Sequence, residues 1–576
     1  MFSHLLPRQP GTEPLARAVR LCRTHFVGAA VFSALINILY LAPTLYMMQV
    51  YDRVVPTGGL VTLTLVTVVA IFALATLAAL DWLRGRLLIR AGLRLDKILA
   101  SVVLSRVFSV QAGQRISQAM REFDTVRTAL SGQGMLALLD APWTPLYLAC
   151  CFLLHPAIGV LTLAGGSILF ALAVLNERDS RSRLKRAILL ANSAYSAQEG
   201  LVGQAEVVRA LGMRQSSAER QITQRDLATR QQADAQLSGG KYAGAIKFLR
   251  LSMQSLSLGM AAYLAVKGQI SPGSIIAASV LLSRAVAPVE MLVGAWPSLV
   301  QARTSWNALV ELFTVTADQD RPITVLPPPS GKLEIEAVSV RMAGTGQAQL
   351  RNISLSLLPG QILGVIGPSG SGKTTLARIV AGALTPTSGM VRLDSAAYGA
   401  RDSDELARHI GYLPQNPSLF AGSVKDNIAR FSTSAEPGEI DRRVVTAAQA
   451  AGTHEMILRL PHGYDTPLGP FGQGVSAGQG QRIALARALY GDPVLIVLDE
   501  PNSCLDQEGE AALMSAILTS ARRGAAVVVV AHRAGVLSRV DRLLVMKDGV
   551  AQTEGPREEV LARMRSASPA VGFRPQ

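Results

Sequence analysis

The run from Leu60 to Leu80 contains no charged residue and is long enough to cross a lipid bilayer as a helix. A soluble core helix is a poor explanation for a run of this length and composition. Similar apolar runs recur in the N-terminal half of the chain. The mean hydropathy of the whole chain is +0.29. The apolar runs predict six membrane-spanning helices, at residues 26–48, 60–80, 135–154, 157–175, 248–266 and 273–295.

The formal net charge of the chain is +15, and two polar, arginine-rich segments of the N-terminal half, 82–134 and 176–247, carry much of it. They contain little Pro or Gly across 84–111 and 176–238, so helices are predicted to continue there from the membrane into the cytosol. Since Lys and Arg mark loops that stay in the cytoplasm, both segments and both chain termini are predicted to be cytoplasmic. Nucleic-acid binding is the alternative for a basic protein, but the sequence lacks the aromatic interleaving and the binding fold that it requires.

A glycine-rich loop follows an apolar strand in the C-terminal half. The strand reads QILGVIG (361–367), and GPSGSGKTT (367–375) continues it into a helix. The spacing matches the P-loop pattern, in which glycines let backbone N–H groups surround phosphate oxygens. Lys373 can reach the β- and γ-phosphates, and Thr374 can bind Mg²⁺. A loop without a ligand is the alternative, but the flanking strand and helix favour a nucleoside triphosphate site.

Two adjacent carboxylates, Asp499 and Glu500, end the apolar strand LIVLDE (495–500). A strand that is apolar throughout is typical of the middle of a parallel sheet, and ligands bind at the carboxyl ends of such strands. Two carboxylates there can hold a metal ion and a water, as hydrolysis of a phosphate chain requires. Alone, such a pair is more often a solvated strand end or a helix cap, but the P-loop favours the catalytic interpretation.

Two further polar residues follow predicted strands. Gln415 comes just after a short strand, where its amide could contact Mg²⁺ or the attacking water or be an ordinary polar loop residue. His532 ends the buried strand AAVVVVAHR (525–533). Most single histidines are structural, but one at a strand end facing a P-loop is a candidate for holding the γ-phosphate or the water.

Taken in order, these motifs resemble the nucleotide-binding domain of an ABC transporter over residues 331–565, with a signature run VSAGQ (475–479) and a D-loop SCLD (503–506). The resemblance implies that Glu500 is the general base, assisted by Gln415 and His532. It implies Mg²⁺ ligation by Thr374, Gln415 and Asp499. It also implies ATP contacts from Gly367, Ser369, Gly370, Ser371, Gly372, Lys373, Thr374, Thr375, Ser476, Gly478, Gln479 and Asp506.

The sites of this family are formed between two such domains, and the chain has one, so the resemblance implies a homodimer. Ser476, Gly478 and Gln479 would then contact the γ-phosphate bound to the opposite subunit. The signature departs from the usual pattern, with Ala477 in place of a glycine and Gly480 in place of an arginine. Weakened rather than abolished turnover is expected from these two residues, since the serine and the glutamine are kept.

Two other positions depart from the family's pattern. Cys504 occupies a D-loop position where an asparagine is expected. Met342 lies near where these domains place an aromatic side chain on the adenine, and methionine orients a base less strongly.

The six spans, two long cytoplasmic excursions and a following ATPase resemble the ABC exporter fold. The predicted fold class is therefore a helical membrane domain with long cytoplasmic extensions, followed by an α/β P-loop domain. The predicted parts are a cytoplasmic segment (1–25), a transmembrane domain (26–321), a linker (322–334), a nucleotide-binding domain (335–565) and a tail (566–576). No cleavable signal peptide is expected, because residues 1–25 are hydrophilic and no A-x-A site follows.

Three membrane phrases, LAPTLYMMQVYDRVVPTGG (41–59), LLDAPWTPLYL (138–148) and SRAVAPVEMLVGAW (283–296), resemble type I secretion ABC transporters, most closely exporters of proteases, lipases and repeats-in-toxin proteins. The resemblance implies ATP-driven export of an unfolded polypeptide with a C-terminal signal across the bacterial inner membrane. It also implies a periplasmic membrane fusion protein and an outer-membrane channel as partners. Two alternatives stay open: an exporter of lipids or small hydrophobic molecules, and a membrane regulator that binds ATP with little transport.

Charged residues within the predicted spans are few, and they are expensive there. Arg284 and Glu290 are predicted to line the translocation path. Snorkelling to the membrane surface, or pairing between helices, is the structural alternative for both residues.

Overall fold

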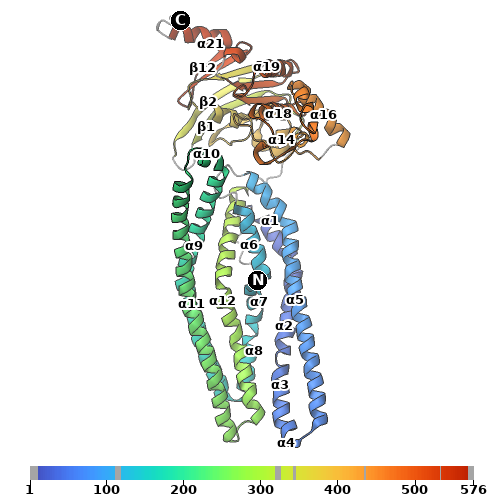
Figure 1. The fold of residues 1–576 in the computed structure, drawn as a ribbon, viewed down its shortest axis with the longest axis vertical. Coiled ribbons are helices and arrows are strands. Elements are labelled where there is room, and N and C mark those ends of the chain that lie inside the picture. The colour runs from blue at the N-terminus through green and yellow to red at the C-terminus, as the bar shows by residue number, and fades with distance from the viewer. Residues whose placement is uncertain are drawn as a thin grey trace. The chain divides into compact units, whose positions relative to one another are not determined.

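The computed structural model describes residues 11–109, 118–317, 326–341, 346–433, 436–531 and 534–567. The chain divides into two compact units, Met1–Arg321 and Pro322–Gln576. In the first unit all the described elements are helical (Figure 1). In chain order they are α1 (Glu13–Leu21), α2 (Arg23–Leu39), α3 (Ala42–Gln49), the π-helical turn η2 (Val50–Val54), α4 (Val55–Thr57), α5 (Leu60–Ser109), α6 (Ala119–Ser131), α7 (Gln133–Asp140), the 3-10 turn η4 (Ala141–Trp143), α8 (Thr144–Leu154), α9 (Pro156–Gly203), α10 (Ala205–Ala210), α11 (Arg214–Val266) and α12 (Pro272–Val315).

Five helical stretches in the described part of the chain are long and apolar enough to cross a membrane. Each contains one of the predicted spans: Arg23–Thr57, Leu60–Ser109, Gln133–Leu154, Pro156–Gly203 and Pro272–Val315. The sixth predicted span, 248–266, is the C-terminal part of α11, which packs along α9 and α12 (Figure 1). Most of α11 is polar and its apolar part contains Arg250, which accounts for its lower hydropathy.

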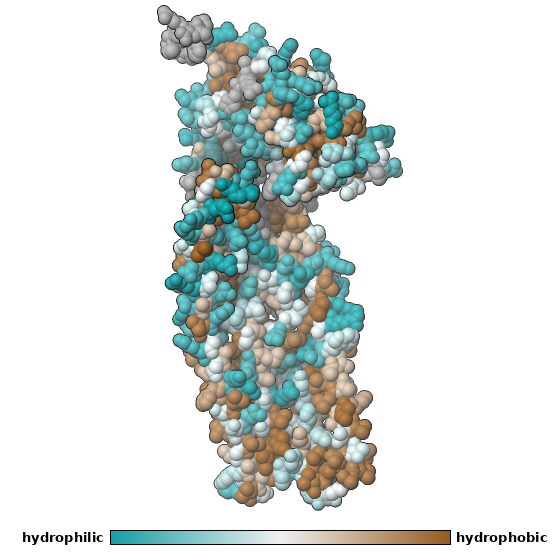
Figure 2. Space-filling model, in the orientation of Figure 1, coloured by the Kyte–Doolittle hydropathy of each residue, from teal (hydrophilic) through white to brown (hydrophobic). Residues whose placement is uncertain are grey.

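The long helices extend well beyond a bilayer. At 1.5 Å per residue, the 50 residues of α5 span about 75 Å, more than twice the hydrocarbon thickness of about 30 Å. Figure 2 shows hydrophobic surface gathered over the lower part of the helical unit and hydrophilic surface over its upper part. Leu60 and Phe72 in the apolar part of α5 are 74% and 73% exposed, as expected of side chains that face lipid. The predicted continuation of spans into polar extensions is confirmed.

The connection between the first two predicted spans, residues 49–59, is helical almost to its end. Helix α3, the π turn and α4 carry the helix to Thr57, so only Gly58 and Gly59 separate it from α5. The π turn contains Asp52, whose Oδ2 accepts from Ser271 Oγ at 2.6 Å and whose Oδ1 accepts from the backbone N of Gly273 at 2.7 Å. Asp52 therefore caps the N-terminus of α12.

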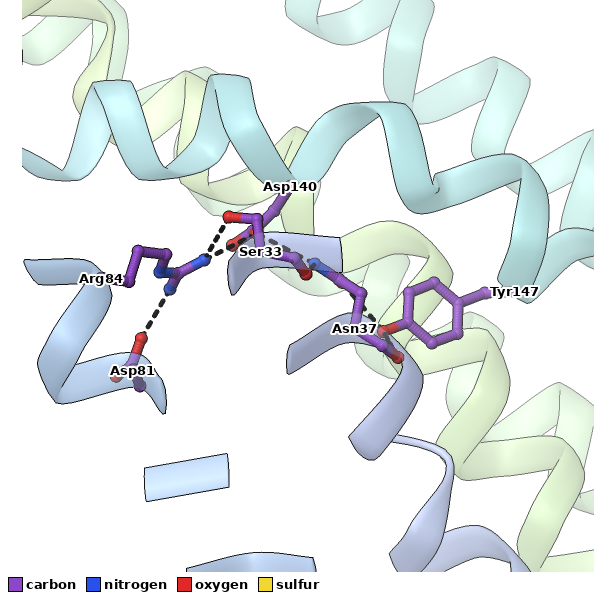
Figure 3. A network of polar contacts seen from close by, with 6 residues as sticks. All are labelled: Ser33, Asn37, Asp81, Arg84, Asp140 and Tyr147. Carbon is purple, nitrogen blue, oxygen red and sulfur yellow. Dashed lines mark hydrogen bonds and ion pairs between the residues drawn. The ribbon is translucent and has the colours of Figure 1, made fainter. Parts of the chain in front are cut away.

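A polar network joins α2, α5, α7 and α8 around the buried side chain of Arg84 (Figure 3). Its Nη1 donates to Ser33 Oγ and to Asp140 Oδ1, each at 2.8 Å, and its Nη2 donates to Asp81 Oδ1 at 2.6 Å. Asn37 Nδ2 donates to the same oxygen of Asp140 at 3.0 Å, and Tyr147 Oη donates to Asn37 Oδ1 at 2.9 Å. The network fixes Asp140 immediately before the turn that separates α7 from α8.

The charged residues that were predicted to line the path have partners on other segments of the helical unit. Glu290 of α12 pairs with Arg250 of α11, with Nε and Oε2 2.9 Å apart. The Arg284 guanidinium lies over the Tyr40 ring, 3.8 Å from its centroid. Both arrangements match the helix-pairing alternative, and a role in the path stays a prediction.

The second unit is an α/β domain. Its strands are β1 (Leu333–Arg341), β2 (Ala348–Leu357), β3 (Ile362–Ile366), β4 (Ser388–Leu393), β5 (Ala396–Ala397), β6 (Ile410–Leu413), β7 (Gly422–Ser423), β8 (Pro467–Leu468), β9 (Leu495–Asp499), β10 (Ala526–Val530), β11 (Arg542–Lys547) and β12 (Val550–Pro556). Its α-helices are α13 (Lys373–Val380), α14 (Ser403–Arg408), α15 (Val424–Ile428), α16 (Pro437–Ala450), α17 (His454–Leu458), α18 (Ala477–Leu489), α19 (Gln507–Arg522), α20 (Ala534–Leu537) and α21 (Arg557–Ala567).

The main sheet of this unit has the strand order β12-β11-β3-β10-β9-β6. All neighbouring pairs are parallel except β11 with β12 at the edge. Strands β9 and β10 are buried at every position, as their uninterrupted apolar sequences predict. A second, antiparallel sheet has the order β2-β1-β4-β5 and shares one hydrophobic core with a face of the main sheet.

Residues of the predicted linker (322–334) are hydrogen-bonded to this unit. Asp394, between β4 and β5, accepts hydrogen bonds from the backbone N–H groups of Ser330, Gly331 and Lys332. These bonds hold the pKa of Asp394 below its ordinary value although burial opposes them. Arg401 donates to the backbone oxygen of Pro327 at 3.0 Å.

Candidate nucleotide site

The P-loop lies between the carboxyl end of β3 and the start of α13. Gly367 has φ 155°, and a Cβ there would lie 2.1 Å from the backbone oxygen of Met546. Gly372 has φ 94°, and a Cβ there would lie 2.6 Å from Leu350 Cδ2. These contacts explain why the loop needs glycine at both positions. Ser369 and Gly370 are exposed at its tip, whereas Thr375 continues the first turn of α13.

Sheet register brings the carboxylates level with the P-loop. Val530 of β10 pairs with Val365 of β3 on one side and with Asp499 of β9 on the other. The residues that follow these strands therefore meet at one edge of the sheet. This is the edge at which open α/β sheets bind ligands.

Asp499 is fully buried, and its Oδ1 lies 3.4 Å from Thr374 Oγ1. Among the described residues its Oδ2 has no hydrogen-bond partner, and neither does the buried Ser371 Oγ of the P-loop. Burial raises the pKa of Asp499 above its ordinary value, against the opposing effect of the Thr374 bond. An unpartnered carboxylate oxygen beside a hydroxyl fits Mg²⁺, which prefers oxygen ligands and keeps a few protein contacts beside the substrate phosphates.

Glu500 and Gln415 lie together at the same edge, with Gln415 Nε2 donating to Glu500 Oε2 at 3.1 Å. Glu500 has a left-handed backbone, with φ 49°, and its N–H donates to the oxygen of Val530 at 3.0 Å. A non-glycine residue in this conformation stores strain, which is common at active sites. The partly exposed carboxylate is suited to accept a proton from a water near the phosphates.

Lys373, the first residue of α13, is buried. Its Nζ donates to the backbone oxygens of Gly367 and Pro368, each at 2.9 Å. Burial lowers the pKa of Lys373 although Glu500 and Asp499 act against the shift. The ammonium therefore already lies inside the loop that would surround a phosphate chain.

The signature residues form a second group. Ser476 caps α18, and its hydroxyl and the Gln479 side chain exchange hydrogen bonds with each other's backbone N–H. They line an open hollow of about 410 Å³ together with Gly478, Cys504 and Asp506, and no described P-loop residue lines it. Asp506 caps α19 through the backbone N of Gly509, and this bond, followed by the bond from Arg482, lowers its pKa. Its carboxylate is thus engaged by its own chain.

The signature departures fit the local backbone. Ala477 is the first residue of α18, where alanine is the best helix former, so its methyl brings no strain there. Gly480 follows in the same helix, and a Cβ there would lie 3.7 Å from Leu419 Cδ1, an ordinary contact. Weakened turnover stays a prediction. His532 and Met342 lie outside the described residues.

Gln481 is a buried residue of α18 that the motifs did not single out. Its side chain bonds to Pro501, Ser503 and Cys504, directly after Glu500. The sequence signal that could have identified this residue is a polar glutamine on an otherwise apolar face of the predicted helix.

Comparisons with known proteins agree with this geometry. Residues 350–503 match the family model described as ABC transporter. The chain is 42% identical over 556 residues to the type I secretion system ATP-binding protein PrsD of Rhizobium meliloti (strain 1021), covering 95% of this chain and 94% of that protein. It is 30% identical to the cyclolysin secretion/processing ATP-binding protein CyaB of Bordetella pertussis (strain Tohama I / ATCC BAA-589 / NCTC 13251), covering 93% of this chain and 76% of that protein.

Among solved structures, a bacterial Atm1-family ABC exporter with ATP bound matches with a TM-score of 0.78 and 21% identity, over 96% of this chain and 99% of that one. That likeness shows the fold, which is the ABC exporter fold predicted from the sequence. The predicted coupling of ATP hydrolysis to transport is likewise confirmed by the family match and the secretion relatives. The chain belongs to the type I secretion ABC transporters, membrane-embedded ATPases of the bacterial inner membrane.

Proposed function

We propose that the protein exports an unfolded polypeptide that carries a C-terminal signal, and that it acts as a homodimer with a periplasmic membrane fusion protein and an outer-membrane channel. The observation that carries the ATPase part of the proposal is the Oδ2 of Asp499, which has no partner among the described residues and lies beside Thr374 at the sheet edge that also holds Glu500. The polypeptide substrate is inferred from the relatives, whose names place them in secretion systems for proteins such as cyclolysin and the toxin RTX-I.

Each residue at the sheet edge has one task in this proposal. The P-loop N–H groups and Lys373 hold the phosphate chain of ATP. Thr374, Asp499 and the amide oxygen of Gln415 would hold Mg²⁺, which would offset charge that develops on the phosphates. Glu500 takes the proton of the attacking water.

The second half of the site comes from another copy of the chain. The hollow beside Ser476, Gly478 and Gln479 is open and contains the N-terminal end of α18, which favours an anion. In a homodimer this hollow would receive the γ-phosphate held by the partner's P-loop. In this proposal both ATPase units and both chain termini are cytoplasmic, as the positive-inside rule predicts, and nucleic acid has no part.

The test compares ATP hydrolysis by the purified wild-type protein with that of Glu500→Gln. We expect the variant to bind ATP normally and to lose at least about a hundredfold in kcat. Glu558→Gln, an exposed residue of α21, is the matched control and should hydrolyse ATP like the wild type. If wild type is no faster than Glu500→Gln, the protein is an ATP-binding regulator and not a transporter.

The substrate class is tested in the same assay. A C-terminal secretion peptide should stimulate the ATPase rate, whereas lipids and hydrophobic drugs should not. Stimulation of the ATPase rate by lipid or drug alone would show that the substrate is a small hydrophobic molecule and not a polypeptide.

A further inference from the structure

The buried amide of Gln481 joins α18 to the segment that follows Glu500. Only 2% of the Gln481 surface is exposed. Its Nε2 donates to the backbone oxygen of Pro501 at 2.5 Å and lies 3.4 Å from Ser503 Oγ. Its Oε1 accepts from the backbone N of Cys504 at 2.9 Å. One side chain thus satisfies a carbonyl and an N–H of the same short loop, which requires a donor and an acceptor together.

Two neighbouring contacts also hold the loop after Glu500 against α18, and we call this set of contacts the joint. Arg482 forms an ion pair with Asp506, the cap of α19. At Gly478 an added Cβ would lie 3.0 Å from the backbone oxygen of Cys504, so helix and loop pack with their backbones close together. Residues 501–506 are therefore held to α18 from Gly478 to Arg482.

Glu500 is attached to this joint through its backbone. Its carbonyl oxygen accepts from the N–H of Ser503 at 3.3 Å, and its φ is 49°. Left-handed backbone at a glutamate persists only where the surroundings over-determine it. A shift of the loop relative to β9 would therefore change the direction of the Glu500 side chain.

We propose that Gln481 is a positioning residue that couples the two ATP sites of a dimer, an inference that rests on the proposed shared site. Ser476 and Gln479, at the start of α18, would meet the γ-phosphate held by the partner. Because Gln481 fastens the same helix to the loop after Glu500, closure of α18 onto that phosphate also sets the Glu500 carboxylate of its own chain. Occupancy of one site thereby prepares catalysis in the other.

Gln481→Glu tests the coupling, since glutamate keeps the acceptor for Cys504 and replaces the donor for Pro501 with a negative charge. We expect unchanged ATP affinity, a kcat lower by on the order of tenfold to a hundredfold, and a Hill coefficient for ATP that falls toward one. Gln507→Glu, the same change at an exposed position of α19, should match the wild type in all three. The measurements use the full-length protein, with ATP binding followed in a Glu500→Gln background.

Arg482→Gln removes the ion pair between α18 and Asp506. It should also lower kcat and the Hill coefficient, but less than Gln481→Glu does. This second variant keeps the test valid if Gln481→Glu does not fold. Wild-type kcat and Hill coefficient in both variants would overturn the coupling. So would a loss of ATP affinity that parallels a loss of thermal stability, because it would make the role structural. Absence of Glu500-dependent hydrolysis in the wild type would instead overturn the proposed function and this inference together.

Discussion

Arg84 shows what a buried charge requires at the scale of one residue. Its side chain is 6% exposed, and the terminal nitrogens bond to Ser33, Asp81 and Asp140. Taking a guanidinium out of water is costly, and breaking a buried pair leaves that cost uncompensated. The partner that matters most is Asp140, because its side chain is 13% exposed whereas that of Asp81 is 52% exposed.

Asp140→Asn is therefore expected to destabilise the protein by about 3–5 kcal/mol, because Arg84 then lacks its buried anion. Asp81→Asn, which removes the exposed partner of the same arginine, should cost at most about 1 kcal/mol. Thermal unfolding of the two purified variants measures the difference. Equal melting temperatures for the two would contradict a special role for the buried pair.

Asp499 is the corresponding case at the nucleotide site. Burial raises its folded-state pKa above the unfolded value, so its ionisation destabilises the folded protein at neutral pH. That destabilisation fades as the pH falls toward the unfolded pKa of about 3.9. Asp499→Asn should therefore raise the melting temperature of the nucleotide-free protein at neutral pH, by about 2–4 °C for each kcal/mol relieved.

The gain from Asp499→Asn should shrink at about pH 5, closer to the pKa of the unfolded chain. Asp465→Asn, whose side chain is 79% exposed, is the control and should not change the melting temperature at either pH. A stabilisation that is independent of pH would show that the charge is not its source.

Among the secondary-structure elements, α12 depends on a residue from another helix. Its own N-cap, Ser271, makes no capping bond, and Asp52 of the π turn supplies the acceptor for Gly273 N. A Cβ at Gly273 would lie 2.8 Å from Asp52 Oδ2 and from the backbone of Met48. The π turn and the start of α12 are therefore fitted to each other.

Gly273→Ala should cost about 1–3 kcal/mol, because the methyl group meets backbone atoms that cannot rotate away. Gly294→Ala, in the same helix, meets no atom of the described residues within 4 Å and should be neutral or stabilising by up to about 1 kcal/mol. Thermal unfolding of the two alanine variants is the measurement. Destabilisation of Gly294→Ala to the same extent would mean that helix composition, not the contact with Asp52, governs α12.

For the whole molecule, the distribution of basic residues predicts the orientation in the membrane. The connection after α11 contains a single basic residue, Lys267, whereas the connection between α9 and α11 belongs to an arginine-rich segment. The positive-inside rule predicts that the first connection lies outside the cytoplasm and the second inside.

In intact inner-membrane vesicles of known sidedness, Gln269→Cys should react with an impermeant thiol reagent only from the periplasmic face. Gln215→Cys, at an exposed position near the start of α11, should react only from the cytoplasmic face. Both cysteine variants are made in, and compared with, a protein in which the exposed Cys504 is replaced, so that Cys504 does not react with the reagent. Reaction of the two cysteines from the same face would refute the proposed orientation.

The sequence by itself determined the features that depend on residues close together in the chain. The P-loop, the strand ending in Asp499 and Glu500, and the apolar runs are each written in one short segment, because backbone conformation and hydrophobic periodicity act locally. The pairing of Arg84 with Asp140, the capping of α12 by Asp52, and the joint between Gln481 and the loop after Glu500 were not predictable in this way. Each combines residues that are ordinary in their own segments, and only tertiary packing decides which buried donor meets which acceptor.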